Sequence, residues 1–225
     1  MRRLPAALAL VAMAAGCGSD PALPHVAGSV ECTVPCETAT DWVSYADHVA
    51  YLDVASEREL PFEQLEGEPD GNGYLPREVT AEVGDVLWTR DGAPSLPAEL
   101  TWDAEGWAVD DGERVPVAFG LRVEVGERYL AVLARFARDD APAWYPVAPD
   151  ALFTLGDDDV PEGTGPDTPA RAALAGESPA EIAALLAATD PDPVAAEYFH
   201  LDPVARYEAV VTQTAPPEGG RRAAG

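Results

Sequence analysis

A run of acidic side chains, GDDDVPE at residues 156–162, is the first place where this sequence could do chemistry. Carboxylate oxygens are the ligands that calcium prefers, and a calcium ion takes about six to eight of them. The run has clustered carboxylates but no defined calcium-loop spacing. We therefore treat Asp157, Asp158 and Asp159 as candidate metal ligands, with an ordinary acidic turn as the alternative.

Ser178, in the segment AGESPAE, is a candidate nucleophile. The segment nearly matches the Gly-x-Ser-x-Gly/Ala elbow of serine hydrolases, which needs a strand before the serine and a helix after it. Here the residues before Ser178 predict a helix, and Ser178, Pro179 and Glu181 have the pattern of a helix start with a capping box. We favour a cap and assign no catalytic residue. A hydrolase that uses Ser178 or carboxylates of the acidic loops is the alternative function.

Cys32 and Cys36 are separated by only three residues. A disulfide between them would close a loop of five residues, for which chain entropy gives about 2 kcal/mol. A redox pair or half of a metal site is the alternative, but zinc wants four ligands and no histidine is near. We predict a disulfide staple near the start of the domain, in an oxidising compartment.

The third cysteine, Cys17, follows two arginines, a short apolar run and small residues, which is the pattern of a secretory signal. The apolar run is about half of the roughly 20 residues that cross a membrane as a helix. Residues 14–17, Ala-Ala-Gly-Cys, resemble the lipobox of bacterial lipoproteins. The resemblance implies cleavage after residue 16 and lipidation of Cys17 with palmitate-type acyl chains, which would anchor the protein on the extracytoplasmic face of the cell membrane. The alternatives are an ordinary secretory signal and a disulfide at Cys17.

The charge balance is strongly acidic, with 40 aspartates and glutamates against 14 basic residues and a net charge of −26. Such a chain repels phosphate backbones, so nucleic-acid binding is disfavoured, whereas cations and basic partners are attracted. All the basic residues are arginines. Chemistries that need a lysine, such as the P-loop and Schiff bases, are therefore excluded, and no cofactor is predicted.

The middle of the chain alternates with period two, which predicts strands. Val79, Ala81 and Val83 alternate with polar residues, and the apolar residues of 128–136 also alternate. A turn is predicted between Trp102 and Trp107, which would leave both side chains exposed as a possible contact surface for a partner or a glycan. Short strands joined by turns that contain glycine and aspartate favour a small barrel or a sandwich.

The order of TAEVGDVLW, VGERYLAVL and ALFTLGDDDV resembles the secreted OB-like barrels of tissue-inhibitor-of-metalloproteinase and netrin modules. Residues 126–130, Gly-Glu-Arg-Tyr-Leu, carry the resemblance, which covers about half of the chain and implies an OB-like barrel. Inhibitors of that family place a free N-terminal cysteine amine on the protease zinc. Cys17 would be acylated and lies far upstream of the barrel, so we carry over the fold and not the activity.

Four helix starts share one pattern after residue 167. Each pairs a side chain that can cap a helix with a proline at the first helical position, where the missing N–H costs nothing. They are Thr168-Pro169, Ser178-Pro179, Asp192-Pro193 and Asp202-Pro203. Together with the strands they predict an α+β fold, an antiparallel barrel followed by short C-terminal helices.

The predicted organisation has five parts, listed from the N-terminus. They are a signal peptide (1–16), a lipidated tether with the disulfide staple (17–40), the β-barrel (41–163), the helical segment (168–213) and a disordered tail (214–225). The three histidines are scattered, and His48 is expected at the surface. The sequence as a whole predicts a membrane-anchored extracytoplasmic lipoprotein that acts by binding an unidentified protein or small molecule. A lipid-anchored structural spacer is a further alternative.

Overall fold

The computed structural model describes residues 32–117, 122–138, 141–148, 151–162 and 168–215, and within them the fold is α+β. A short helix comes first, eight strands follow, and four short helices come last. In chain order these elements are α1 (Ala39–Tyr45), β1 (His48–Glu59), β2 (Glu63–Gln64), β3 (Gly73–Thr89), β4 (Glu99–Asp110), β5 (Glu113–Pro116), β6 (Arg128–Phe136), β7 (Ala143–Pro146), β8 (Leu152–Thr154), the 3-10 turn η1 (Asp157–Asp159), α2 (Pro169–Leu174), α3 (Pro179–Ala188), α4 (Pro193–Glu197) and α5 (Pro203–Thr214).

The strands form one antiparallel sheet in the order β5-β4-β3-β1-β6-β7, with β2 paired to β3 and β8 to β6. The sheet curls, because β4 contacts β7 although three strands separate them in this order. The result is a half-barrel, as predicted. Irregularities in the pairing of β1 with β3 accompany the curl, and such bulges increase local twist.

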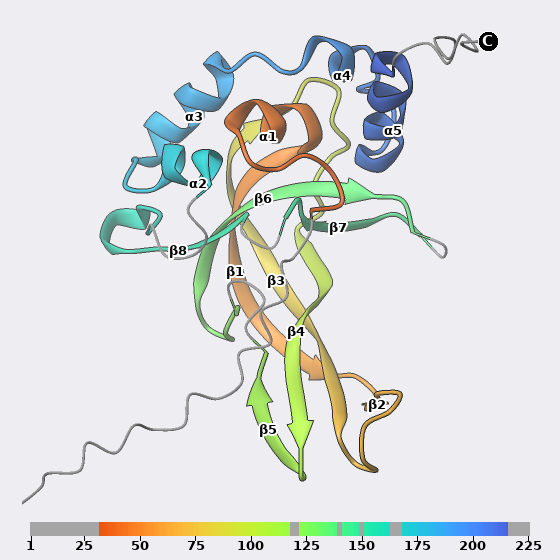
Figure 1. Ribbon diagram of the computed structural model, residues 1–225. Helices are drawn as coiled ribbons and strands as arrows, with labels where there is room; N and C mark the ends of the chain where they lie inside the picture. The colour runs from red at the N-terminus through yellow and green to blue at the C-terminus, as the bar shows by residue number, and fades with distance from the viewer. Residues whose placement is uncertain (1–31, 118–121, 139–140, 149–150, 163–167, 216–225) are drawn as a thin grey trace, which may run out of the picture.

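Both faces of β6 and of the first half of β1 are buried. Val49 and Tyr51 pack against the helices on the convex face, while Ala50, Leu52 and Val54 fill the concave face. The alternation predicted for residues 128–136 is confirmed, because Leu130, Val132 and Ala134 of β6 all belong to the convex-face core. Figure 1 shows the helices gathered at one end of the sheet, while β2, β5 and the ends of β3 and β4 extend away from them.

All four predicted helix starts are confirmed. Thr168, Ser178, Asp192 and Asp202 are the N-caps of α2 to α5, and a proline follows each of them. Each side-chain oxygen accepts a hydrogen bond from a backbone N–H of the first turn, which satisfies a donor that the helix leaves unpaired. The helix α1, with its capping box at Thr38, was not predicted.

The predicted turn between Trp102 and Trp107 is wrong, because β4 runs through both residues as one strand. Opposite it on β3, Leu75 pairs with Trp107 and Arg77 with Ala104, so β4 carries one extra residue there in a bulge. A tight turn instead follows β4 and joins it to β5. Asp111 and Gly112 both have a positive φ, 48° and 79°, as a tight hairpin turn requires.

Cys32 and Cys36 form a disulfide, with 6.4 Å between their Cα atoms, as the sequence predicts. Cys36 is buried against the convex-face core, so the staple attaches the start of the described chain to the domain. Cys17 lies outside the described residues. In the part of the chain that is described, no helix is both long enough and apolar enough to cross a membrane.

Candidate functional site

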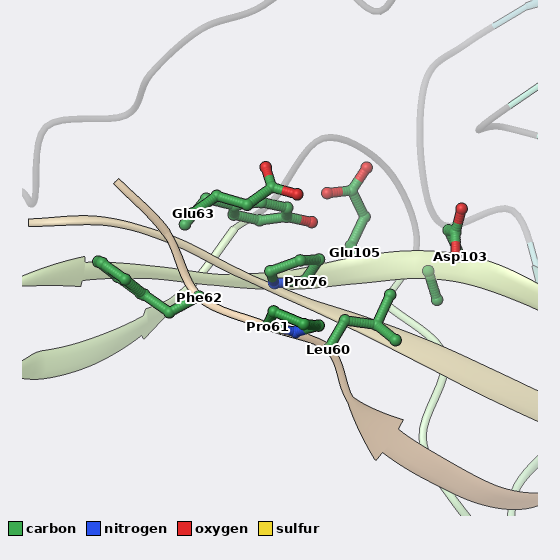
Figure 2. A pocket seen from close by; sticks show the side chains of 9 residues that line it. Leu60, Pro61, Phe62, Glu63, Pro76, Asp103 and Glu105 are labelled. Atoms are coloured by element: carbon green, nitrogen blue, oxygen red, sulfur yellow. The ribbon is translucent and has the colours of Figure 1, made fainter. Parts of the chain in front are cut away.

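A groove of about 510 Å³ opens on the part of the sheet that extends away from the helices. Its walls come from three parts of the chain, namely the β1–β2 connection with the start of β2, the start of β3 and the middle of β4. The residues that line it are Leu60, Pro61, Phe62, Glu63, Tyr74, Pro76, Asp103, Ala104 and Glu105. Figure 2 shows Leu60, Pro61 and Pro76 as an apolar strip, with the carboxylates of Glu63, Glu105 and Asp103 projecting to the same side of it.

The bulge in β4 shapes one wall of the groove, because Glu105 and Gly106 lie in the stretch where the β3–β4 register shifts. The Gly106 N–H donates to the Tyr74 hydroxyl oxygen at 2.9 Å, which joins the aromatic wall to the bulge. A Cβ on Gly106 would stand 2.1 Å from the Leu75 carbonyl oxygen. Only glycine therefore allows β4 to approach β3 this closely.

Two guanidinium groups hold the bulge. Arg77 Nε donates to the Glu105 carbonyl at 2.6 Å, and Arg122 Nη1 donates to the carbonyls of Glu105 and Gly106, each at 2.9 Å. Arg77 is completely buried and also forms an ion pair with Glu57. These charge-assisted bonds fix the backbone that carries Glu105, and the Gly106 carbonyl also accepts from the Val117 N–H at 3.4 Å.

The indole of Trp107 packs against these two guanidinium groups and against that of Arg114. The Arg122, Arg114 and Arg77 guanidinium carbons lie 4.6, 5.6 and 5.7 Å from its ring centroid. Trp107 pairs with Leu75, which belongs to the buried face of β3, whereas the groove residues Tyr74 and Pro76 belong to the other face. The groove therefore rests on a layer of arginine and tryptophan rather than on an aliphatic core.

The groove carries uncompensated negative charge. None of the three carboxylates, those of Glu63, Asp103 and Glu105, forms an ion pair with another described residue. Burial raises the pKa of the Glu105 carboxyl above its ordinary value, and the positive charges of Arg122 and Arg77 offset only part of that effect. A partly desolvated carboxylate beside apolar side chains favours a cationic group that brings its own apolar surface.

An exposed phenylalanine marks the entrance of the groove. Phe62 is 43% exposed and Leu65, just beyond β2, is 49% exposed. A Cβ on Gly73 would stand 2.2 Å from the Glu63 carbonyl oxygen and 2.7 Å from the Phe62 ring, so Gly73 allows the β1–β2 connection to lie against β3. Large exposed apolar side chains beside a groove are typical of binding surfaces.

The three aspartates proposed as metal ligands are not brought together as a ligand set. Asp159 instead forms an ion pair with Arg128 at 3.1 Å, and Asp158 and Asp159 have positive φ values of 61° and 60° within the turn η1. Among the described residues no group of three or more side chains is placed to hold a metal ion. The alternative considered for this stretch, an acidic turn, agrees with these contacts.

Ser178 lies where a helix cap belongs. The Ser178 hydroxyl oxygen accepts from the Glu181 N–H at 3.4 Å, and the Ser178 backbone N–H donates to Glu181 Oε2 at 2.9 Å, which makes the capping box complete. The Ser178 hydroxyl also donates to Glu181 Oε2 at 2.5 Å. These hydrogen bonds lower the pKa of the Glu181 carboxyl. The segment before Ser178 is the helix α2 and not a strand, so the elbow geometry is missing.

The proposed contact surface of Trp102 and Trp107 needs a correction. Trp102 is only 5% exposed and belongs to the concave-face core, because continuous β4 places it opposite Val79. Trp107 is half-buried among the arginines described above. The two indoles therefore do not form an exposed pair.

His48 is buried, and the surface position expected for it is wrong. Its Nε2 lies 2.7 Å from the Pro94 carbonyl oxygen, its Nδ1 lies 3.0 Å from the Thr89 hydroxyl, and its ring packs against Trp144. Burial lowers its pKa. The neighbouring Asp47 forms a buried ion pair with Arg90 at 2.5 Å, so this cluster has structural partners throughout.

The groove residues Glu63, Tyr74, Asp103 and Glu105 are not among the site residues predicted from the sequence. One signal was available, because an isolated glycine inside an alternating strand, here Gly106, indicates a bulge or a close backbone approach. No protein-family model matches this sequence, and a search of curated proteins finds no match either. The resemblance to tissue-inhibitor-of-metalloproteinase and netrin modules remains a resemblance.

Proposed function

We propose that this protein is a lipid-anchored extracytoplasmic binding module whose ligand site is the groove between the β1–β2 connection and β4. The observation that carries the proposal is the composition of the groove, an apolar strip flanked by three carboxylates that have no described ion-pair partner. Its volume falls in the range of about 300–1,000 Å³ that is usual for ligand sites.

The membrane location rests on the lipobox-like residues 14–17 and agrees with the disulfide at Cys32 and Cys36, since disulfides persist in oxidising compartments. We expect wild-type protein in the membrane fraction and a Cys17→Ser variant in the soluble fraction. Firm membrane association of the Cys17→Ser variant would contradict the anchor without affecting the groove.

Site-specific photo-cross-linking in native membranes tests the groove directly. A photoreactive phenylalanine analogue at Phe62 should give defined adducts with the ligand. The same analogue at Val211, on α5, is the matched control, because the two side chains are similarly exposed at 43% and 48%. Equal adduct patterns at the two positions, or none at Phe62, would remove the groove as the ligand site.

A hydrolase is the second candidate, and one observation favours it. Glu105 has a raised pKa and shares the groove with Asp103, a pattern in which one carboxyl serves as general acid and another as base or nucleophile. Turnover of a chromogenic glycoside that disappears in both Glu105→Gln and Asp103→Asn would favour this candidate over the binding module. Turnover unchanged in both variants would argue against it.

A further inference from the structure

We infer that the groove takes an arginine or lysine side chain from an extended basic polypeptide. This inference rests on the groove being the ligand site, and it adds the identity of the occupant. Leu60, Pro61 and Pro76 supply an apolar strip along which the aliphatic stem of such a side chain would lie. The carboxylates of Glu63, Glu105 and Asp103 stand on one side of that strip, where a cationic head would end.

Charge excludes the other obvious occupants. The chain carries a net charge of −26, so a second copy, a nucleic acid or an anionic lipid surface would be repelled. An uncharged apolar ligand would bury Glu105 still further without a counter-charge, although its carboxyl already has a raised pKa. A cation with an aliphatic stem is attracted by the negative charge of the chain. It also supplies the counter-charge that a buried Glu105 carboxylate needs.

The sheet beside the groove favours a polypeptide over a small cation. On the solvent-facing side of β3 and β4, Glu78, which also forms an ion pair with Arg58, lies opposite Asp103 at the groove. Glu82 lies opposite Glu99 four residues along each strand. Like charges directly opposite each other destabilise a sheet. Neither Glu82 nor Glu99 has an ion-pair partner among the described residues.

The spacing of these pairs suits an extended chain. Four residues along a strand span roughly 13 Å, and an extended polypeptide covers the same distance in the same number of residues. A partner with one basic side chain in the groove would thus carry a second above Glu82 and Glu99. A small cation that fills the groove alone would leave that second pair uncompensated.

Fluorescence anisotropy with the full-length chain in detergent tests the inference. The probe is a short labelled peptide of alternating arginine and serine, and the comparisons are the same peptide with glutamate in place of arginine, and free spermidine as a competitor. We expect the arginine peptide to bind, the glutamate peptide not to bind, and added salt to weaken binding. Spermidine should displace the peptide only weakly.

Variants of the chain complete the test. Glu105→Gln should weaken arginine-peptide binding about tenfold, the size expected for one charge-assisted hydrogen bond. Glu82→Gln should weaken it less, and Glu208→Gln, an exposed glutamate on α5, should leave it unchanged. Equal affinities for Glu105→Gln and Glu208→Gln would overturn the inference, as would spermidine that competes as well as the unlabelled peptide.

Failure of this inference is distinguishable from failure of the proposed function. If Phe62 cross-links a ligand in membranes but the arginine peptide does not bind, the groove remains the site and the basic polypeptide is wrong. If Phe62 gives no adduct and the peptide does not bind, both are wrong.

Discussion

The helix-covered body and the arm that extends from it are built in different ways. We call "the body" the helices together with β6, β7, β8 and the adjoining halves of β1 and β3, and "the arm" β2, β5 and the far ends of β1, β3 and β4 (Figure 1). Apolar side chains fill the body on both faces of the sheet. The arm is held instead by the buried guanidinium of Arg77 and by Arg114 and Arg122 around Trp107.

Apolar contacts in the body and guanidinium hydrogen bonds in the arm have different roles. Apolar burial is non-directional and supplies most of the free energy of folding. A guanidinium makes several hydrogen bonds in a fixed plane, so Arg77 can hold the carbonyls of Glu105 and Val123 in place. We conclude that the body stabilises the fold and that the arm positions the groove.

The same substitution in the two regions should have very different effects. Phe153, in the body, is fully buried and contacts Trp42 edge-on with 6.0 Å between ring centroids. Phe153→Ala should lower the free energy of unfolding by about 3–5 kcal/mol. Phe62→Ala, in the arm, should change it by less than about 0.5 kcal/mol, because Phe62 is already 43% exposed. Urea denaturation measures both, and equal losses would mean that the arm contributes to the core.

Loss of Arg77 should loosen the arm and leave the body intact. Arg77→Met removes the donors to the Glu105 and Val123 carbonyls and leaves Glu57 without its partner, for a loss of about 2 kcal/mol. Hydrogen exchange should accelerate in β4 and β5 but not in β6. Arg58→Met, which removes an exposed ion pair with Glu78, is the control and should cost less than about 1 kcal/mol. Accelerated exchange throughout the sheet would show that the two regions unfold as one unit.

Most of the body follows from the sequence because its signals are local. A capping residue followed by proline fixes each helix start, and two-residue alternation assigns Leu130 and Ala131 to opposite faces without knowledge of their partners. The position of His48 was wrong for the opposite reason. Its partners Thr89 and Pro94 are more than 40 residues away, and nothing near His48 in the sequence indicates them.

The arm was harder to predict because long-range contacts determine it. Glu105 becomes a groove residue only because β4 bulges, and the bulge depends on Arg77 and Arg122, one on another strand and one in a loop. In sequence these arginines are indistinguishable from surface charges. The stretch around Gly106 also looks like a turn in the sequence, because a glycine beside acidic residues is typical of turns as well as of bulges.

A methyl group at the bulge should disturb the sheet more than one at Gly92, which lies in a turn just after β3. Gly106→Ala places a Cβ 2.1 Å from the Leu75 carbonyl, so the backbone must shift, at a cost of about 1–3 kcal/mol. Gly92→Ala has open space around the new Cβ and should cost about 1 kcal/mol, from its φ of 73° alone. Amide chemical shifts should move in β3 and β4 for Gly106→Ala and only next to the substitution for Gly92→Ala. Shifts confined to residue 106 and its sequence neighbours would contradict the close approach.

The smallest expected effect is a gain in the free energy of unfolding, whereas the substitutions above all lower it. The pKa of Glu105 is raised by burial above its ordinary value of 4.5, so the folded chain holds this proton more tightly than the unfolded chain. Its contribution to stability is therefore complete below pH 4.5 and is lost as the pH rises through the raised pKa. Glu105→Gln should then stabilise the protein slightly at neutral pH, and the gain should vanish below pH 4.5, as urea midpoints across this range would show. A variant that is more stable and yet binds the arginine peptide less well would mean that the arm keeps a destabilising charge for binding, whereas a loss of stability at neutral pH would mean that Glu105 serves the fold.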